Sequence, residues 1–466
     1  MKAMGLFGGV QVMGIICSII RTKLVAVWIG PVGVGLFGLF NNALEMLNTG
    51  TNLGIRASSV RDISQAVASD DRGLIARIVV VVRRWSLWLG LGGALLTLVL
   101  SPLLSQVTFG TQDYLWGFVA MSVAVLLMAL SNGEQAVLQG TQRLKRLARA
   151  SVSGTMLGLV ISVPLFYWLR ERSVLPSIIA YAACNALMMW LLRNKEYPTV
   201  EVSRRQTVQM GREFVRLGIY MTIGTFVTIV AGYVFNAWLN HQAGTAVVGH
   251  YQAGYTLINK YTGLILTALG MEYYPRLSQV IADPSRLREF VSREVSVAML
   301  VLAPVVAIFV VLREPVIQLL YSSDFTVIED MVAWGMVGMV MRALSWCMAF
   351  VILARGDGRT YVVTEVVSAV VGLLLNIMFY SWWGITGLGL SFLAWYVVYT
   401  VIIGVVYCGR YHLSLSRGSV LQWLWSLAVA VAVVLAMQWQ CVWIAVVVAL
   451  LSLVVSSLQL VKQWRG

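Results

Sequence analysis

The sequence has few charged residues, and its cysteines and histidines form no metal-binding pattern. Only 12% of the 466 residues are charged, whereas soluble chains average about 25%. The five cysteines show no Cys-x-x-Cys spacing and the three histidines no His-Glu-x-x-His spacing, so we expect neither a metal site nor a disulfide framework. With a hydrophobic content of 59%, the chain cannot bury its apolar surface in a soluble core. Lipid is therefore the expected solvent for most of it.

Long apolar runs separated by charged segments predict fourteen transmembrane helices. Each run is close to the roughly 20 residues that a helix needs to cross about 30 Å of hydrocarbon. A β-barrel is excluded, because residues 420–437 are apolar on all faces rather than alternating. The predicted spans are 4–29, 34–55, 85–107, 114–138, 150–169, 176–192, 214–240, 247–272, 295–312, 330–354, 360–383, 385–408, 420–437 and 441–461.

The net charge of +14 indicates membrane orientation rather than nucleic-acid binding. Cytoplasmic loops retain Lys and Arg, and with the N-terminus inside, 27 of the 34 basic residues fall on the inner side. Only three fall on the outer side, and four lie deep within spans, with Arg216 at the inner end of its span counted as inner. We therefore expect both termini in the cytoplasm.

Matched turns at a nearly constant offset predict an internal duplication. Residues 30–37 align with 244–251, 101–103 with 314–316 and 138–143 with 354–359, at offsets of 213 to 216. Because each half has six helices, both halves start on the same side, as in transporters whose substrate site lies between parallel repeats. The expected domains are an N-lobe (1–192), a cytoplasmic linker (193–213), a C-lobe (214–409) and a C-terminal hairpin with a tail (410–466).

Charged residues inside the predicted spans are the candidate functional residues. An ionised side chain there costs about 2.5–3.5 kcal/mol, so it needs a cavity, a partner or a substrate. Four cations and one acid from both halves leave a positive surplus, which suits an anionic ligand such as a pyrophosphate in one shared chamber. Another acid enters the eleventh span, and neighbouring amides suit sugar hydroxyls. These candidates are Arg21, Lys23, Lys260 and Arg342 for the anion, Glu45 and Glu365 for ion coupling, and Asn41, Asn48 and Asn259 for sugar.

A purely structural role is the alternative for these residues. Glu45 could pair with Arg21 or Lys260, and Glu365 with Arg342, as contacts between helices. Salt bridges alone would leave no positive excess, so we favour the ligand site. No residue is expected to be catalytic.

Several sequence motifs stand out: residues 21–27 (RTKLVAV), 30–36 (GPVGVGL) and 274–278 (YPRLS), together with Arg342 and residues 364–366 (TEV). They resemble the motifs of Wzx-type flippases of O-antigen and enterobacterial common antigen. The resemblance covers roughly residues 4–410. Lys23, Arg342 and Glu365 match positions where the family usually has a charge, whereas Lys260 departs from a relative with an acid there. The identity of the coupling ion therefore stays open.

The resemblance implies an all-α fold of the multidrug, oligosaccharidyl-lipid and polysaccharide exporter (MOP) superfamily, with two pseudo-symmetric six-helix lobes as in MATE transporters. It implies export of undecaprenyl-pyrophosphate-linked oligosaccharide, such as an O-antigen unit, across the bacterial inner membrane by alternating access, coupled to protons or sodium. Its implied partners are membrane lipids, a polysaccharide polymerase and a chain-length regulator, without a cofactor. The terminal hairpin exceeds the usual twelve spans and resembles the extra helices of lipid II flippases, which help to form a groove for the lipid tail.

Two other functions are open at this stage. A MATE-like multidrug or sodium antiporter has the same architecture, but it would need surplus carboxylates in its chamber. A polytopic glycan polymerase or ligase would need a sizeable outer loop, whereas the longest outer connection here is about 17 residues, 313–329.

Overall fold

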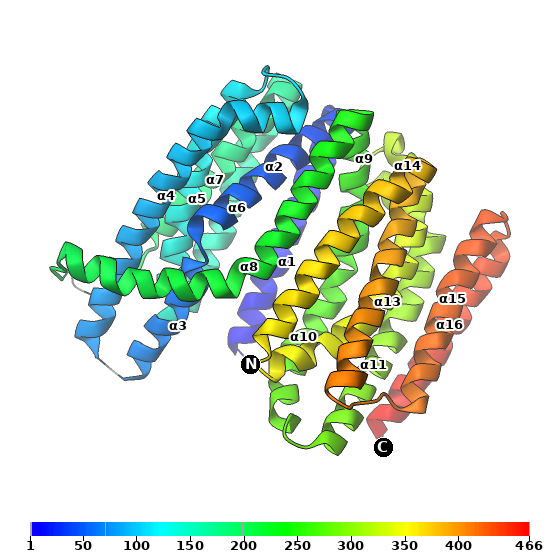
Figure 1. The fold of residues 1–466 in the computed structure, drawn as a ribbon. Coiled ribbons are helices and arrows are strands. Elements are labelled where there is room, and N and C mark those ends of the chain that lie inside the picture. Colours follow the sequence, from blue (N-terminus) through cyan, green and yellow to red (C-terminus); the bar gives the residue numbers. More distant parts are fainter. Residues whose placement is uncertain (1, 70, 198–199, 466) are drawn as a thin grey trace. The chain divides into compact units, whose positions relative to one another are not determined.

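The computed structural model describes residues 2–69, 71–197 and 200–465. All regular secondary structure in these residues is helical (Figure 1), which confirms the all-α prediction. The α-helices are α1 (Lys2–Trp28), α2 (Gly30–Asn52), α3 (Ile55–Ala68), α4 (Arg72–Phe109), α5 (Leu115–Gly140), α6 (Leu144–Leu169), α7 (Val174–Leu191), α8 (Arg204–Ala243), α9 (Thr245–Tyr255), α10 (Gly263–Val280), α11 (Pro284–Val311), α12 (Arg313–Leu320), α13 (Glu329–Ala354), α14 (Gly358–Val405), α15 (Arg417–Gln438) and α16 (Val442–Arg465). Short 3₁₀ or π-helical turns are η1 (Arg170–Ser173), η2 (Thr256–Tyr261), η3 (Ser323–Ile328) and η4 (Val406–Arg410).

Each of the fourteen predicted spans falls mainly on a helical segment. In the described part of the chain, nine helical stretches are long and apolar enough to cross a membrane. Two of these stretches, 144–191 and 358–410, each contain a pair of predicted spans. The three spans expected on α1, α2 and α9–α10 are not among the nine stretches. That these three segments cross the membrane stays a prediction.

The structure divides into two compact units, unit 1 (Met1–Gly249) and unit 2 (His250–Gly466). In unit 1, α4 packs along α5, α5 also contacts α7, and α7 packs along α6 (Figure 1). Aromatic and aliphatic side chains such as Phe40 of α2 and Phe118 and Met121 of α5 form its core. Helices α2, α5 and α7 contact one another, and α1 contacts α2.

The first turns of α8 are docked on α4. The Ser203 hydroxyl accepts a hydrogen bond from the Gln206 N–H at 3.2 Å, and the Gln206 side chain accepts one from the Ser203 N–H at 3.3 Å, which caps the helix. The Trp85 indole N–H donates to the Thr207 carbonyl at 2.8 Å. Residues 204–213 of the expected linker are therefore helical, while the predicted lobe boundaries themselves stay a prediction.

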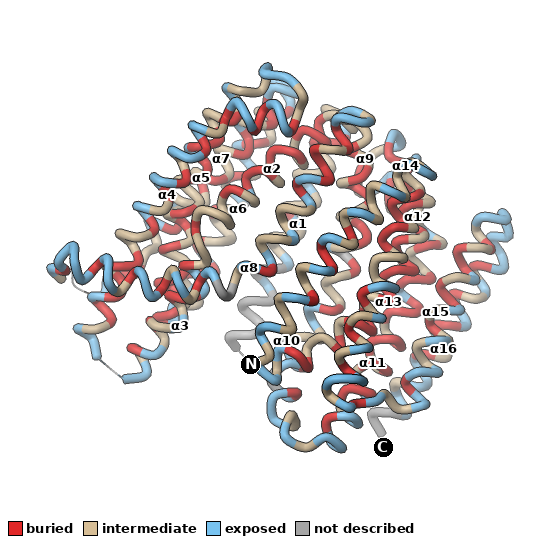
Figure 2. The backbone as a smooth tube through the Cα atoms, in the orientation of Figure 1, coloured by how far each residue is buried: buried red, intermediate tan, exposed pale blue. Residues whose placement is uncertain are grey.

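Helix α13 is the centre of unit 2. In its most apolar stretch 72% of the residues are buried, compared with 22% in α16 (Figure 2). Helices α10, α11, α14 and α15 contact it. The α15–α16 hairpin packs on α11, where the Ser416 N–H donates to the Ser292 hydroxyl at 2.9 Å.

Unusual backbone conformations recur in the two predicted halves of the chain at an offset of 214 residues. Gly30 (φ 81°) is the first residue of α2, and Gly244 (φ 83°) lies between α8 and α9, so each follows the first long helix of a predicted repeat. Arg170 (φ 52°, ψ −129°) and Gly384 (φ 58°, ψ −139°) separate paired spans in the same conformation. Such shared local geometry supports a duplication, because positive φ is uncommon outside glycine.

The same offset corrects one alignment made from the sequence. The sequence comparison pairs Gly140 with Gly356, at an offset of 216. In the structure, Gln142 (φ 56°) corresponds to Gly356 (φ 69°), since the hydrogen bond from Arg143 N to Leu138 O is repeated from Asp357 N to Ile352 O. The paired prolines also differ, because Pro102 lies inside α4 and Pro315 in the first turn of α12.

Candidate functional site

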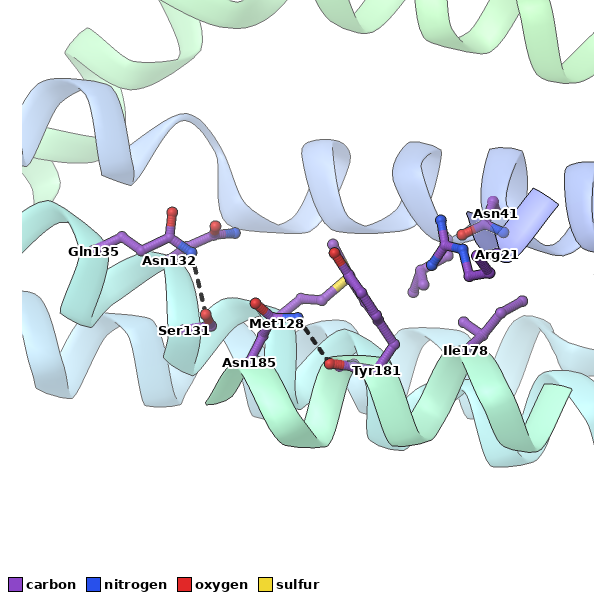
Figure 3. A pocket seen from close by; sticks show the side chains of 11 residues that line it. Arg21, Asn41, Met128, Ser131, Asn132, Gln135, Ile178, Tyr181 and Asn185 are labelled. Carbon is purple, nitrogen blue, oxygen red and sulfur yellow. Dashed lines mark hydrogen bonds between the residues drawn. The ribbon is translucent and has the colours of Figure 1, made fainter. Parts of the chain in front are cut away.

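A polar pocket lies among α1, α2, α5 and α7 of unit 1. Its cavity volume is about 270 Å³, and Figure 3 shows the side chains that line it. Ile178 and Met128 supply apolar surface. The polar lining consists of Arg21, Asn41, Ser131, Asn132, Gln135 and Asn185, with Tyr181 beside them.

Of the described residues that line this pocket, Arg21 is the one with a charge. Its guanidinium carbon lies 4.6 Å from the ring centre of Phe37 and 4.8 Å from that of Tyr181. The Nε atom is buried without a hydrogen-bond partner, and within the described residues Arg21 forms no ion pair. Two aromatic rings therefore hold the charge in place without neutralising it.

The amide side chains of the pocket are only partly used by the protein. Asn41 donates to the Phe37 carbonyl at 2.7 Å. Asn185 donates to the Tyr181 carbonyl at 2.9 Å and Gln135 to the Ser131 hydroxyl at 3.2 Å (Figure 3). An amide has two N–H donors and an oxygen acceptor. The remaining groups can bind hydroxyl or acetamido groups of a ligand.

A second polar cluster lies in unit 2, on α13, α14 and η2. Arg342 of α13 donates to the Asn259 amide oxygen, and its guanidinium carbon lies 5.6 Å from the ring centre of Tyr396. The Tyr399 hydroxyl donates to Glu365 Oε1 at 2.6 Å. Glu365 thus binds a tyrosine rather than Arg342, and neither residue forms an ion pair in the described part of the chain.

The other predicted residues are spread over both units. Lys23 is half-buried on α1, Glu45 is exposed on α2, and Lys260 is exposed in the π-helical turn η2. Asn48 accepts from Asn132 at 3.4 Å. Arg21 and Asn41 share the pocket of unit 1, and Arg342 and Asn259 contact each other in unit 2. One chamber common to both sets stays a prediction.

Several site residues are missing from the sequence prediction. Tyr181 and Asn185 lie one helical turn apart on α7, and Tyr396 and Tyr399 lie on α14. Tyr181 and Asn185 could have been found from the sequence, because they are polar residues four apart in an apolar span and so share one face of the helix. No group of three or more His, Cys, Asp or Glu residues that could hold a metal occurs among the residues described.

The family match covers residues 75–330, more than half of the chain, and the family is described as polysaccharide biosynthesis protein. The lipid III flippases of Escherichia coli (strain K12) and Shigella flexneri are each 24% identical over 397 residues, covering 81% of this chain and 90% of theirs.

Solved structures share the fold. The lipid II flippase MurJ in an inward closed conformation has a TM-score of 0.75 at 11% identity, covering 99% of this chain and 100% of that one. An inward-facing multidrug resistance MATE family transporter of the MOP superfamily has a TM-score of 0.72 at 15% identity, with 86% and 94% covered.

Proposed function

Since the chain belongs to the polysaccharide biosynthesis protein family, we propose that it is a flippase that moves a lipid-linked oligosaccharide across the membrane. The resemblance to polysaccharide exporters of the MOP superfamily is consistent with the relatives, which are named lipid III flippases. The fold is that of a lipid II flippase and of MATE transporters. These similarities favour a transporter over a glycan polymerase or ligase.

The Arg21 pocket is the observation that carries this proposal. A buried cation without a carboxylate costs free energy in an apolar bundle, and it is surrounded by amides with unused hydrogen-bonding groups. An anionic ligand rich in hydroxyl groups would neutralise the cation and form hydrogen bonds with the amides. A glycan attached to a phosphate group has this chemistry, whereas a cationic drug does not.

The finer proposal concerns the carrier and the route. The substrate is undecaprenyl-pyrophosphate bearing an O-antigen or a related repeat unit, carried outward across the bacterial inner membrane by alternating access. Its prenyl tail stays in the lipid while the sugars cross between the lobes. An inside-negative membrane potential favours the outward movement of a net anion.

The predicted site residues take defined roles in this proposal. Lys23, Lys260 and Arg342, together with Arg21, attract the pyrophosphate, and Asn41, Asn48 and Asn259 bind sugar. Glu45 and Glu365 are the candidates for proton or sodium coupling. The Arg342–Asn259 hydrogen bond supports a joint role for these two residues, since it holds the guanidinium of α13 next to η2.

The test is complementation of a bacterial strain that lacks its own flippase. Arg342→Ala and Lys260→Ala variants should reach the membrane at normal levels but fail to restore surface glycan. Arg172→Ala, which removes an exposed charge from unit 1, is the control and should restore it. Full restoration by both site variants would contradict the cationic site.

A drug-efflux assay in the same cells separates the rival function. A MATE-like antiporter should lower the accumulation of cationic drugs and leave surface glycan unchanged. Export of glycan without drug efflux is the result that we expect.

A further inference from the structure

A second cavity of unit 1 lies among α4, α5 and α7, and it shares no residue with the Arg21 pocket. Its cavity volume is about 520 Å³. Leu127, Leu130 and Gly133 follow one face of α5 at three-residue spacing and form its floor. Helices α4 and α7 both pack on α5 and form the walls. The cavity is therefore a groove that runs along three helices.

The groove is apolar along most of its length. Ala183, Ala186, Leu187 and Trp190 line the α7 wall, and they cover about 10 Å of helix at 1.5 Å per residue. The small side chains of the two alanines leave room beside α5. Trp190 is 55% exposed and Leu187 46%, so this wall opens to the surroundings, which for a membrane-spanning helix are lipid.

One end of the groove is polar. Arg83 of α4 forms a bidentate ion pair with Glu134 of α5, with Nε–Oε1 and Nη2–Oε2 distances of 2.7 and 3.0 Å. Arg83 also donates to the Asn194 carbonyl at 3.0 Å. Glu134 therefore neutralises Arg83, and this pair adds no net charge to the groove.

Arg193 leaves the same end positively charged. Its guanidinium carbon lies 5.3 Å from the ring centre of Trp190, and among the residues described it has no ion pair. The nearby acid Glu196 is already paired with Arg143 and Arg146. Ser86 also lines the groove, and its hydroxyl is buried without a hydrogen-bond partner.

We propose that this groove binds an anionic glycerophospholipid. One acyl chain lies on α5 between the walls of α4 and α7, and the phosphate contacts Arg193 above Trp190. An anionic lipid is favoured over a zwitterionic one because Arg193 supplies a positive charge that no carboxylate of the described residues pairs with. This proposal is independent of the flippase function.

The test measures lipid retention by the full-length purified protein with native mass spectrometry. The protein is incubated in detergent with phosphatidylglycerol or phosphatidylethanolamine of the same acyl chains. Wild-type protein should retain phosphatidylglycerol better, by about fivefold for one basic contact. Arg193→Gln should lower this retention to the level of phosphatidylethanolamine. Arg172→Gln removes the same charge from an exposed position of unit 1 and should change nothing.

A second variant tests the acyl-chain part of the groove. Ala186→Leu fills the space beside α5 and should lower retention of both lipids, while Arg193→Gln affects only the anionic one. Equal retention of the two lipids by wild-type protein would overturn the proposal. So would unchanged retention of phosphatidylglycerol by Arg193→Gln, or a polyprenyl phosphate that occupies the groove and excludes phosphatidylglycerol. If Ala186→Leu does not fold, the Arg193→Gln result decides alone.

Discussion

Arg21 carries a charge that unit 1 holds between two aromatic rings without a carboxylate. Stacking of this kind contributes only about 0.5–2 kcal/mol, which is less than the cost of an unpaired buried charge. We expect Arg21→Met to leave the Tm of the purified protein unchanged or to raise it, while surface glycan is lost in the complementation assay. Arg149→Met, at an exposed position, is the control for expression. A fall in Tm of several degrees would show that Arg21 is mainly structural.

Arg170 has a backbone conformation with positive φ. The corresponding residue in unit 2 is a glycine, Gly384, which has the same conformation. Strain at such a position costs about 1–3 kcal/mol for a residue with a side chain. The Arg170 guanidinium donates to the Trp28 carbonyl at 2.6 Å, which offsets part of this cost. Arg170→Ala loses the contact and keeps the strain, whereas Arg170→Gly loses both. Thermal denaturation should therefore give Arg170→Gly the higher Tm, and the opposite order would contradict the strain.

At the scale of single elements, the docking of α8 depends on Gly211. A Cβ atom there would lie 1.7 Å from the Trp85 Nε1 atom, so Gly211→Ala must displace Trp85 and break its bond to Thr207. Overpacking of this kind costs about 1–3 kcal/mol, and a lower Tm with altered tryptophan fluorescence is expected. Gly232→Ala is the matched control, because it lies on the same helix with nothing within 4 Å. If both variants behave alike, the docking contact is unimportant.

The start of α14 depends on Asp357. Hydrogen bonds from the side chain and N–H of Thr360, and from Tyr411, lower the pKa of its carboxyl group, with Arg410 3.0 Å away. A lowered pKa means that the ionised group stabilises the folded state above its unfolded pKa of about 3.9 and that this stability is lost as pH falls through the folded value. Between about pH 5 and 3, the Tm of wild-type protein should fall more than that of Asp357→Asn. If the Tm of both proteins falls equally with pH, the Asp357 carboxylate is not the cause of the acid destabilisation.

At the scale of the whole molecule, the distribution of Lys and Arg predicts the topology. Alkaline phosphatase is active only outside the cytoplasm, so fusions after Gln112 or Arg172 should be active and fusions after Lys195 or Asp283 inactive. An active fusion after Lys195 or Asp283 would place that loop outside the cytoplasm and contradict the expected orientation.

Much of the helical framework was predictable from hydrophobicity alone. The predicted turn between residues 383 and 385 is confirmed at Gly384, because apolar runs of membrane length leave few places for a chain to reverse. Arg21 and Arg342 were recognisable because an ionised group is rare in such a run. Tyr181, Asn185 and Tyr399 were missed, since uncharged polar residues are common in spans and their sequence positions do not identify the helix that they face.

The sequence by itself determined that the chain is helical, where most helices begin and end, and which spans carry charge, because these properties follow from local hydrophobicity and from the cost of charge in lipid. Only the tertiary structure decided that Arg21 stacks between Phe37 and Tyr181, that Glu365 binds Tyr399, and that Arg193 stands at the end of a groove. These contacts join residues from different helices or depend on how a helix faces its neighbours. Side-chain packing sets that orientation, and hydrophobic pattern alone does not specify it.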